Sequence, residues 1–177
     1  LKNLTAFLAN AKSDPIPLIA VDQEGGLVSR LTRRNGFSNF PSARNIGRNP
    51  SYSTKESVVR LYGSMAHELA DAGFNLNFGP VVDLSLNDSN TVIVRRKRSY
   101  GADPLLVANL ARDFITAHRE ANIVTVAKHF PGHGSSHADS HLRLADVSKT
   151  WRAMELDPYR ILAKDGMLDM VMVGHLY

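Results

Sequence analysis

The sequence of 177 residues contains no cysteine. Disulfide bonds and cysteine-ligated metal sites are therefore excluded within it. It also lacks any apolar run near the ~20 residues that a membrane-spanning helix needs, so we predict no membrane span. The chain begins with Leu1, and no charged segment with an apolar core follows that would indicate a targeting signal. A segment of a longer protein would begin in the same way.

Motifs for binding nucleotides and nucleic acids are scarce as well. No Gly-x-Gly-x-x-Gly pattern follows a predicted strand, and no Walker-type loop is present. The formal net charge is +4, but the densest basic run, residues 95–98, is short and is not interleaved with aromatic residues. Such a run is typical of a solvated surface. We therefore expect no nucleic-acid partner and no cofactor.

The composition, with 44% hydrophobic and 21% charged residues, is that of an ordinary globular protein. Residues 1–177 fall within the size range of one domain and can bury a substantial core. Short apolar runs alternate with amphipathic helical patterns along this length. We predict strands at residues 17–21, 74–82, 123–127 and 170–173.

Helical patterns separate these runs. The first helix begins at the capping-box pattern of residues 53–56 and ends at Gly73. The second begins at Asp103, an N-cap followed by proline. The third is broken and restarts at Asp157. The chain therefore alternates strands with helices, which is the order of an α/β protein.

The predicted strands are near-continuous apolar runs, as expected of strands buried on both faces of a parallel sheet. Two folds fit this pattern: a doubly wound four-stranded domain and a section of a (β/α)8 TIM barrel. Polar residues follow each strand, and in a barrel these strand ends meet at one mouth. They are Asp22, Asp83, Lys128, His129 and His175. We therefore predict an α/β fold, a section of a TIM barrel with about four βα units.

Four of the seven histidines recur at intervals of four, at His129, His133, His137 and His141. On a helix this spacing would place the imidazoles on one face, as a metal site would require. Pro131 and two glycines interrupt the run, so we predict a loop. A zinc site would need three of these imidazoles to converge without a supporting helix, and we expect no metal ion.

Chemistry is indicated at both ends of this loop. Asp139 and His141 form an Asp-x-His pair, in which the carboxylate orients an imidazole that acts as a general acid or base. Two solvated side chains are the alternative. Lys128 and His129 end a strand, where a lysine is costly to bury unpaired. They provide either hydrogen-bond donors for a polyhydroxylated ligand or ion pairs with strand-end aspartates.

Together these residues resemble a known family. Residues 127–134 (AKHFPGHG), followed by the Asp-Ser-His of residues 139–141, are similar to the signature of the β-N-acetylglucosaminidases of glycoside hydrolase family 3. Further segments extend the resemblance over nearly the whole chain in the family's order. They are residues 20–26 with Arg30, residues 77–83 and residues 98–101.

The resemblance implies a role for each candidate residue. His141 would be the general acid/base, and Asp139 its dyad partner. The terminal N-acetylglucosamine would be held by Asp22, Arg30, Arg98, Lys128 and His129. The implied reaction is retaining cleavage of that sugar through a covalent glycosyl-enzyme intermediate on an aspartate.

The implied biology is the release of N-acetylglucosamine from muropeptides during peptidoglycan recycling. Such enzymes act in the cytoplasm of Gram-negative bacteria, and relatives elsewhere are secreted; we expect a cytoplasmic enzyme. Two alternatives stay open. A family 3 glycoside phosphorylase would use phosphate in place of water, since a histidine donor tolerates phosphate attack better than a carboxylate does. A non-catalytic amino-sugar-binding protein would keep only the binding residues.

The implied nucleophile is the main departure from the family. It lies on a strand after the one that ends at His175, and this sequence stops at Tyr177. The first strand and the last strands of the barrel are also expected to be missing. We therefore expect a partial catalytic domain that does not turn over substrate alone. The open sheet edges of such a section would allow self-association.

Overall fold

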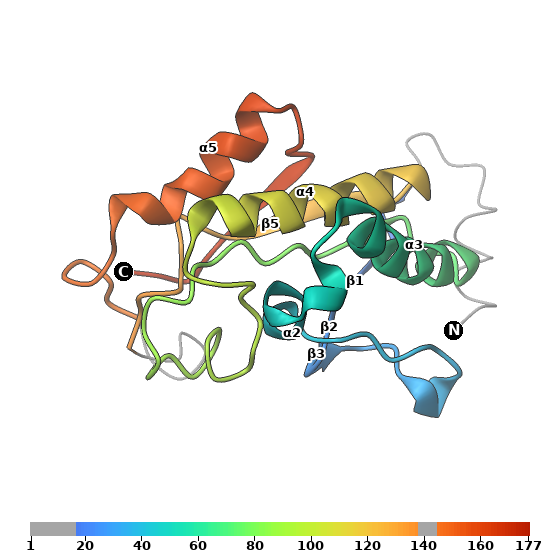
Figure 1. Ribbon diagram of the computed structural model, residues 1–177, viewed down its shortest axis with the longest axis horizontal. Coiled ribbons are helices and arrows are strands. Elements are labelled where there is room, and N and C mark those ends of the chain that lie inside the picture. The colour runs from blue at the N-terminus through green and yellow to red at the C-terminus, as the bar shows by residue number, and fades with distance from the viewer. Residues whose placement is uncertain (1–16, 138–144) are drawn as a thin grey trace.

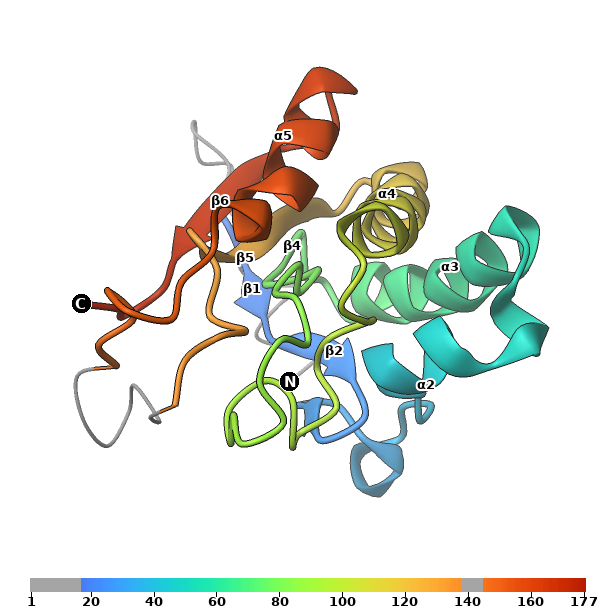
Figure 2. The ribbon, with the colours of Figure 1, turned by 60° about the vertical axis from the view of Figure 1, so that its left-hand side comes forward.

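A parallel sheet is the centre of the structure. The computed structural model describes residues 17–137 and 145–177. The sheet has the order β1 (Ala20–Val21), β4 (Leu76–Asn77), β5 (Val124–Phe130) and β6 (Met170–Val173). Helices α3 (Lys55–Asp71), α4 (Pro104–Glu120) and α5 (Asp157–Lys164) each precede the next strand of this sheet (Figure 1). Figure 2 shows these helices on one side of the strands, which confirms the predicted barrel-type α/β fold.

The predicted capping box of residues 53–56 is not formed: the N-cap of α3 is Thr54, which accepts a hydrogen bond from the backbone N–H of Ser57. Asp103 is the N-cap of α4, as predicted, and accepts a hydrogen bond from the backbone N–H of Leu105. Gly73, just after α3, has a φ of 87°, a left-handed conformation that glycine adopts without strain. Among the described residues, no helix combines the length and the apolar character that crossing a bilayer requires.

β4 is shorter than predicted. It ends at Asn77 and does not continue to residue 82, because Pro80 has no N–H group to donate to a sheet ladder. Val81 nevertheless pairs with Lys128 in an isolated bridge, so the chain stays beside β5.

β5 is longer than predicted. It continues to Phe130, so Lys128 and His129 lie within the strand and not after it. Its pairing with β6 shifts register between Lys128 and Phe130. The register shift places the site residues at an irregular part of the sheet.

Several short elements were not predicted from the sequence. A hairpin of β2 (Gln23–Gly25) and β3 (Val28–Ser29) follows β1 directly. The others are α2 (Ala43–Arg48) and 3-10 helices η1 (Arg33–Asn35), η2 (Pro50–Tyr52) and η3 (Ala153–Leu156). Each is too short to produce a readable hydrophobic period.

The prediction that every strand is buried on both faces is wrong for β1, where Ala20 is exposed, and for β6. Met170, Val171 and Val173 are 41%, 41% and 66% exposed. Within the described residues β6 is an edge strand, so only one of its sides pairs with a neighbour. Apolar sequence indicates what a strand is able to bury, and packing decides whether it does.

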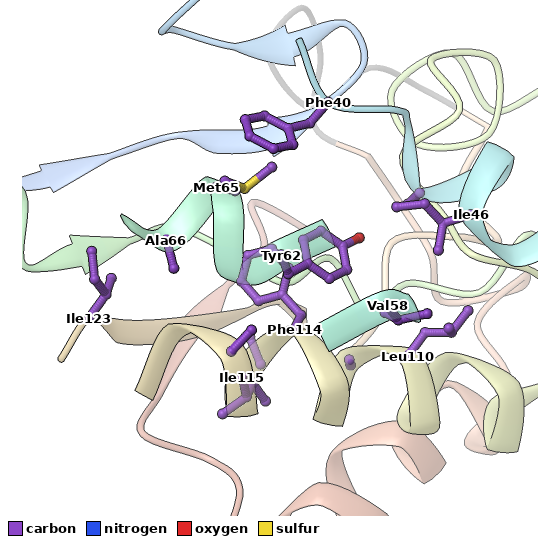
Figure 3. Close-up of a cluster of buried hydrophobic side chains, with 14 of the residues drawn as sticks. Phe40, Ile46, Val58, Tyr62, Met65, Ala66, Leu110, Phe114, Ile115 and Ile123 are labelled. Carbon is purple, nitrogen blue, oxygen red and sulfur yellow. The ribbon is translucent and has the colours of Figure 1, made fainter. Parts of the chain in front are cut away.

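The hydrophobic core lies between α3, α4 and the sheet (Figure 3). Tyr62 and Phe114 meet edge to face with ring centroids 4.6 Å apart, and Phe114 also stacks on His118 at 4.0 Å. The Tyr62 hydroxyl forms a 2.6 Å hydrogen bond with the Tyr100 hydroxyl, so both polar ends are satisfied although each ring is buried. This core fixes the two helices against the strands that carry the site.

Phe114→Ala should lower the free energy of unfolding by about 3–5 kcal/mol, because Phe114 is 1% exposed and its removal leaves a cavity between two aromatic rings. Leu105→Ala is the matched control on the same helix. Leu105 is 56% exposed, so its truncation should cost less than about 1 kcal/mol. Urea denaturation of both variants checks this, and similar losses in the two would contradict the assigned core.

Candidate functional site

A cavity of about 370 Å³ opens at the carboxyl ends of the parallel strands. It is lined by residues that follow β1 and β6 and by residues of β5. The predicted binding residues Asp22, Arg30, Arg98, Lys128 and His129 all line it, together with Phe78, Arg96 and His175 among others. The prediction that polar strand-end residues converge on one mouth is therefore confirmed for Asp22, Lys128, His129 and His175, whereas Asp83 is buried and does not line the cavity.

The centre of the site is the ammonium group of Lys128, whose side chain is 2% exposed. Nζ donates to Asp22 Oδ1 at 2.8 Å and lies 2.7 Å from Glu24 Oε1. A lysine buried to this degree requires paired charge, because an isolated ammonium loses its hydration without compensation. Lys128 thus forms the predicted ion pair with a strand-end aspartate. It also lines the cavity, as a hydrogen-bond donor to a ligand would have to.

Glu24 is a site residue that the sequence prediction missed. Arg98 donates two hydrogen bonds to its carboxylate, from Nε to Oε2 at 2.8 Å and from Nη2 to Oε1 at 2.7 Å. The two side chains are 11% and 6% exposed. One buried anion therefore holds both cations of the inner wall, Lys128 and Arg98. The sequence could have indicated this role of Glu24, because Glu24 lies two residues after Asp22 and alternate residues of an extended chain share a face.

Both carboxylates are ionised at neutral pH. Burial would raise the pKa of Asp22, but the hydrogen bond and charge of Lys128, helped by the nearby arginines, lower it below the ordinary value. Burial acts in the same direction on Glu24, and Arg98 and Lys128 again outweigh it and lower the pKa. The cluster consists of opposite charges held close together in a buried setting, where they attract more strongly than in water.

Arg30 lies at the mouth of the cavity. Its side chain is 67% exposed, and Nη2 is 3.6 Å from Asp22 Oδ2. At this distance the charges attract each other without a hydrogen bond. The guanidinium donors of Arg30 therefore face the solvent at the entrance.

Asp83 fixes the orientation of His129. Its side chain is fully buried; Oδ2 lies 2.7 Å from His129 Nδ1, and Oδ1 accepts the backbone N–H of His133 at 2.8 Å. His129 Nε2 is 3.3 Å from Arg98 Nη2. Because a guanidinium only donates, Nε2 accepts when the ring is neutral, and the single proton of the neutral imidazole then resides on Nδ1. Asp83 was noted as a strand-end residue, and the structure gives it this supporting role.

The loop after β5 is secured by residues of the recognised signature. A Cβ on Gly134 would lie 1.7 Å from the carbonyl oxygen of Leu84, so only glycine fits. Asn90 Nδ2 donates to the His133 carbonyl at 2.8 Å, and the Gly134 N–H donates to Glu155 Oε2 at 3.1 Å. Burial raises the pKa of Glu155. Part of the signature therefore serves to pack the loop against neighbouring segments.

The evenly spaced histidines have different partners. His133 Nδ1 lies 2.8 Å from Ser136 Oγ, and His137 Nδ1 lies 3.1 Å from Asn87 Nδ2, whereas His129 faces a carboxylate. Residues 131–137 form a loop, as predicted, whereas His129 lies in β5. Within the described part of the chain, no three His, Asp or Glu side chains are grouped so that they could hold a metal ion.

Asp139 and His141, the predicted acid/base pair, lie in residues 138–144, outside the described residues. The chain resumes at Ala145, which pairs with Leu176 in a parallel bridge. The neighbouring His175 lines the cavity. Ala145, the first described residue after this segment, thus lies beside the chain end that carries His175.

The arrangement is suited to binding a polyhydroxylated molecule. Asp22 presents acceptors, and Lys128 and Arg98 present donors, on the wall of one cavity. Ion pairs already hold these side chains in place. A ligand that binds them therefore loses little affinity to side-chain ordering.

The stability of the protein should depend on Asp83 in acid. Burial would raise the pKa of Asp83, but the charge and hydrogen bond of His129 and the backbone N–H of His133 lower it below the ordinary 3.8. The stabilisation is therefore complete above 3.8 and is lost as the pH falls through the lower folded-state pKa. Asp83→Asn should remove this part of the acid-dependent loss of the free energy of unfolding.

Urea unfolding between about pH 2 and pH 6 measures this loss. The control is Asp71→Asn, at an exposed position at the end of α3, which should keep the wild-type dependence on pH. An Asp83→Asn variant with the wild-type dependence would contradict the role given to this carboxylate.

The whole sequence matches one protein family. Residues 1–177 match the family described as "Glycosyl hydrolase family 3 N terminal domain". A β-hexosaminidase from Tolumonas auensis is 37% identical over 179 residues, which cover 99% of this chain and 51% of the relative. One from Pseudomonas aeruginosa is 38% identical over 165 residues, covering 92% and 47%. The chain thus spans about half the length of these curated relatives.

Solved structures show the same likeness. NagZ from Neisseria gonorrhoeae, in complex with N-trifluoroacetyl-D-glucosamine, superposes with a TM-score of 0.86 at 32% identity, covering 99% of this chain and 52% of that one. A family 3 β-N-acetylglucosaminidase from Paenibacillus superposes with a TM-score of 0.86 at 35% identity, covering 99% and 33%. The resemblance carried by the motifs is confirmed, and this chain belongs to glycoside hydrolase family 3.

Proposed function

We propose that the protein carrying this chain is a retaining exo-β-N-acetylglucosaminidase that releases terminal N-acetylglucosamine from peptidoglycan-derived muropeptides. The observation that carries the proposal is the buried charge cluster at the carboxyl ends of the strands, in which Lys128 joins Asp22 and Glu24. Membership of family 3 and relatives named β-hexosaminidase support it.

In this proposal the terminal sugar occupies the closed end of the cavity. Lys128 and Arg98 donate hydrogen bonds to sugar hydroxyls, and Asp22 accepts one. The hydrogen bond with Asp83 fixes the orientation of the His129 ring beside them. Because these groups are fixed before the sugar arrives, the glycosidic bond is presented in one orientation, which supplies the positioning part of the rate acceleration.

We assign the acid/base role to His141 and the orientation of its ring to Asp139. An imidazole titrates near neutral pH, so it gives a proton to the leaving oxygen in the first step and takes one from water in the second. The carboxylate stabilises the charged form of the ring. The return of the chain at Ala145, beside the cavity-lining His175, supports this assignment.

The nucleophile in this proposal is an aspartate outside the 177 residues. Asp22 is bound to Lys128, and the buried Asp83 is bound to His129, so both carboxylates are already engaged. An anionic nucleophile about 5 Å from a histidine donor would suit retention and would avoid the repulsion between two carboxylates. Activity is therefore expected of the full-length protein encoded by the gene.

The full-length protein should hydrolyse N,N′-diacetylchitobiose. His141→Ala should lower kcat/KM roughly 10²- to 10⁴-fold, because the leaving hydroxyl then departs without a proton donor. His137→Ala is the matched control, since His137 lies four residues earlier in the loop and contacts Asn87. Its kcat/KM should stay close to that of the wild type. Initial rates, with NMR of the first anomer formed, measure both effects.

Two results would contradict the assignment. Equal losses of kcat/KM in the two variants would show that His141 is not the proton donor. A product with inverted anomeric configuration would exclude the covalent intermediate. A sugar 1-phosphate formed only in phosphate buffer would indicate a phosphorylase in place of a hydrolase.

A further inference from the structure

A second cavity, of about 760 Å³, lies between helices α2, α3 and α4. Within the described part of the chain, no residue lines both this interhelical cavity and the cavity at the strand ends. Its floor is apolar: Ile46, Val58 and Leu110, one from each helix, are 2%, 1% and 6% exposed (Figure 3). Its rim is polar and exposed, and includes Arg48 and Asn49. The proposed reaction does not use this cavity.

Asp113 brings a buried carboxylate to the interhelical cavity. The residue is 9% exposed and lines the cavity, and it forms no hydrogen bond or ion pair with any other described residue. The adjacent Arg112 pairs instead with Asp165 and Asn109. Burial raises the pKa of Asp113, whereas on Glu24 bound cations outweigh burial and the pKa is lowered. An unpaired buried carboxylate is costly, so its oxygens are left to accept from a ligand.

The charges around Asp113 determine which donors can reach it. Lys55 and Arg112 attract its carboxylate, and Glu56 repels it. Among the described lining residues, the bases Arg48, Lys55 and Arg112 surround a single acid, Asp113. This excess of positive charge repels a cationic ligand, and an anionic ligand that reaches the floor meets the carboxylate itself. The donors that satisfy Asp113 are therefore neutral hydroxyl or amide groups, because a carboxylate only accepts hydrogen bonds.

Two amides at the rim complete the polar groups of the cavity. Asn49 Oδ1 accepts the backbone N–H of Ser51 at 3.0 Å, and Asn109 Oδ1 accepts a hydrogen bond from Arg112 Nη1 at 2.6 Å. Both carbonyl oxygens are thus engaged, which leaves the Nδ2 groups to donate to a ligand. The cavity therefore offers acceptors at its floor, donors at its rim and an apolar surface between them.

We propose that the interhelical cavity binds a neutral saccharide, whose neighbouring hydroxyls donate to the two carboxylate oxygens of Asp113. The C–H face of the sugar ring packs on the apolar floor, and sugar oxygens accept from the two rim amides. Mostly apolar walls with a few placed polar groups are the usual form of a small-molecule site. The inference is independent of the proposed reaction, and it adds a second place at which a glycan is held.

The test is a titration of the full-length protein with N-acetylglucosamine and with glucose, followed by NMR of the backbone amides. Amides of residues 109–113 report the interhelical cavity, and those of residues 127–130 report the cavity at the strand ends. Both sugars should cause saturable shifts at residues 109–113, with a Kd on the order of 1 mM. Glucosamine in its ammonium form should bind there at least about 5-fold more weakly, because the lining cations repel it.

Asp113→Ala should weaken binding at residues 109–113 roughly 10- to 100-fold, since hydrogen bonds to a charged acceptor are lost. The variant should fold, because it removes an unpaired buried carboxylate. Asp113→Asn keeps one acceptor oxygen and should lose less affinity. Glu120→Gln is the matched control, since Glu120 is an exposed acid on the same helix that does not line the cavity. Its Kd should equal that of the wild type.

The proposal is overturned if neither sugar causes a saturable shift at residues 109–113, or if glucosamine binds there as tightly as the neutral sugars. An unchanged Kd in Asp113→Ala, or an equal loss of affinity in Glu120→Gln, also overturns it. Shifts at residues 127–130 are read in the same titration, so failure at the interhelical cavity is distinguished from failure of the proposed sugar site at the strand ends.

Discussion

The rest of the site depends on one buried cation. Lys128 sits on β5 with a side chain that is 2% exposed, and it is tolerable there only because Asp22 and Glu24 supply opposite charge at 2.8 and 2.7 Å. These partners come from the segment after β1, so the ion pairs tie together strands that are not neighbours in the sheet. The same contacts hold polar groups in place on the cavity wall.

The remaining site residues extend this arrangement outward. Glu24 also binds Arg98, which connects the cluster to the segment of residues 90–100. Asp83 orients His129 and accepts the N–H of His133, which connects β5 to the loop that follows. Parallel strands make this possible, because their carboxyl ends meet at one edge and a few charges there contact one another. Fold and site are thus joined through electrostatics as well as through packing.

Much of this was readable from the sequence, for definable reasons. Asp22, Lys128 and His129 were predicted to converge because they end apolar runs, and the parallel-sheet rule places such ends together. The roles of Glu24 and Asp83 were not predicted, because they arise from pairings across 74 and 46 positions that no local pattern encodes. Short elements such as the β2–β3 hairpin left no periodic signal, and the exposure of β6 depends on its place at the sheet edge.

The central claim is that the ion pairs around Lys128 form the binding site for a terminal N-acetylglucosamine. A crystal structure of the full-length protein with this sugar tests it most directly. The account predicts sugar hydroxyls within hydrogen-bond distance of Asp22 and Lys128, with the ring inside the cavity that His129 and Arg98 line. A sugar bound elsewhere, with the Asp22–Lys128–Glu24 cluster making no contact to it, would contradict the account.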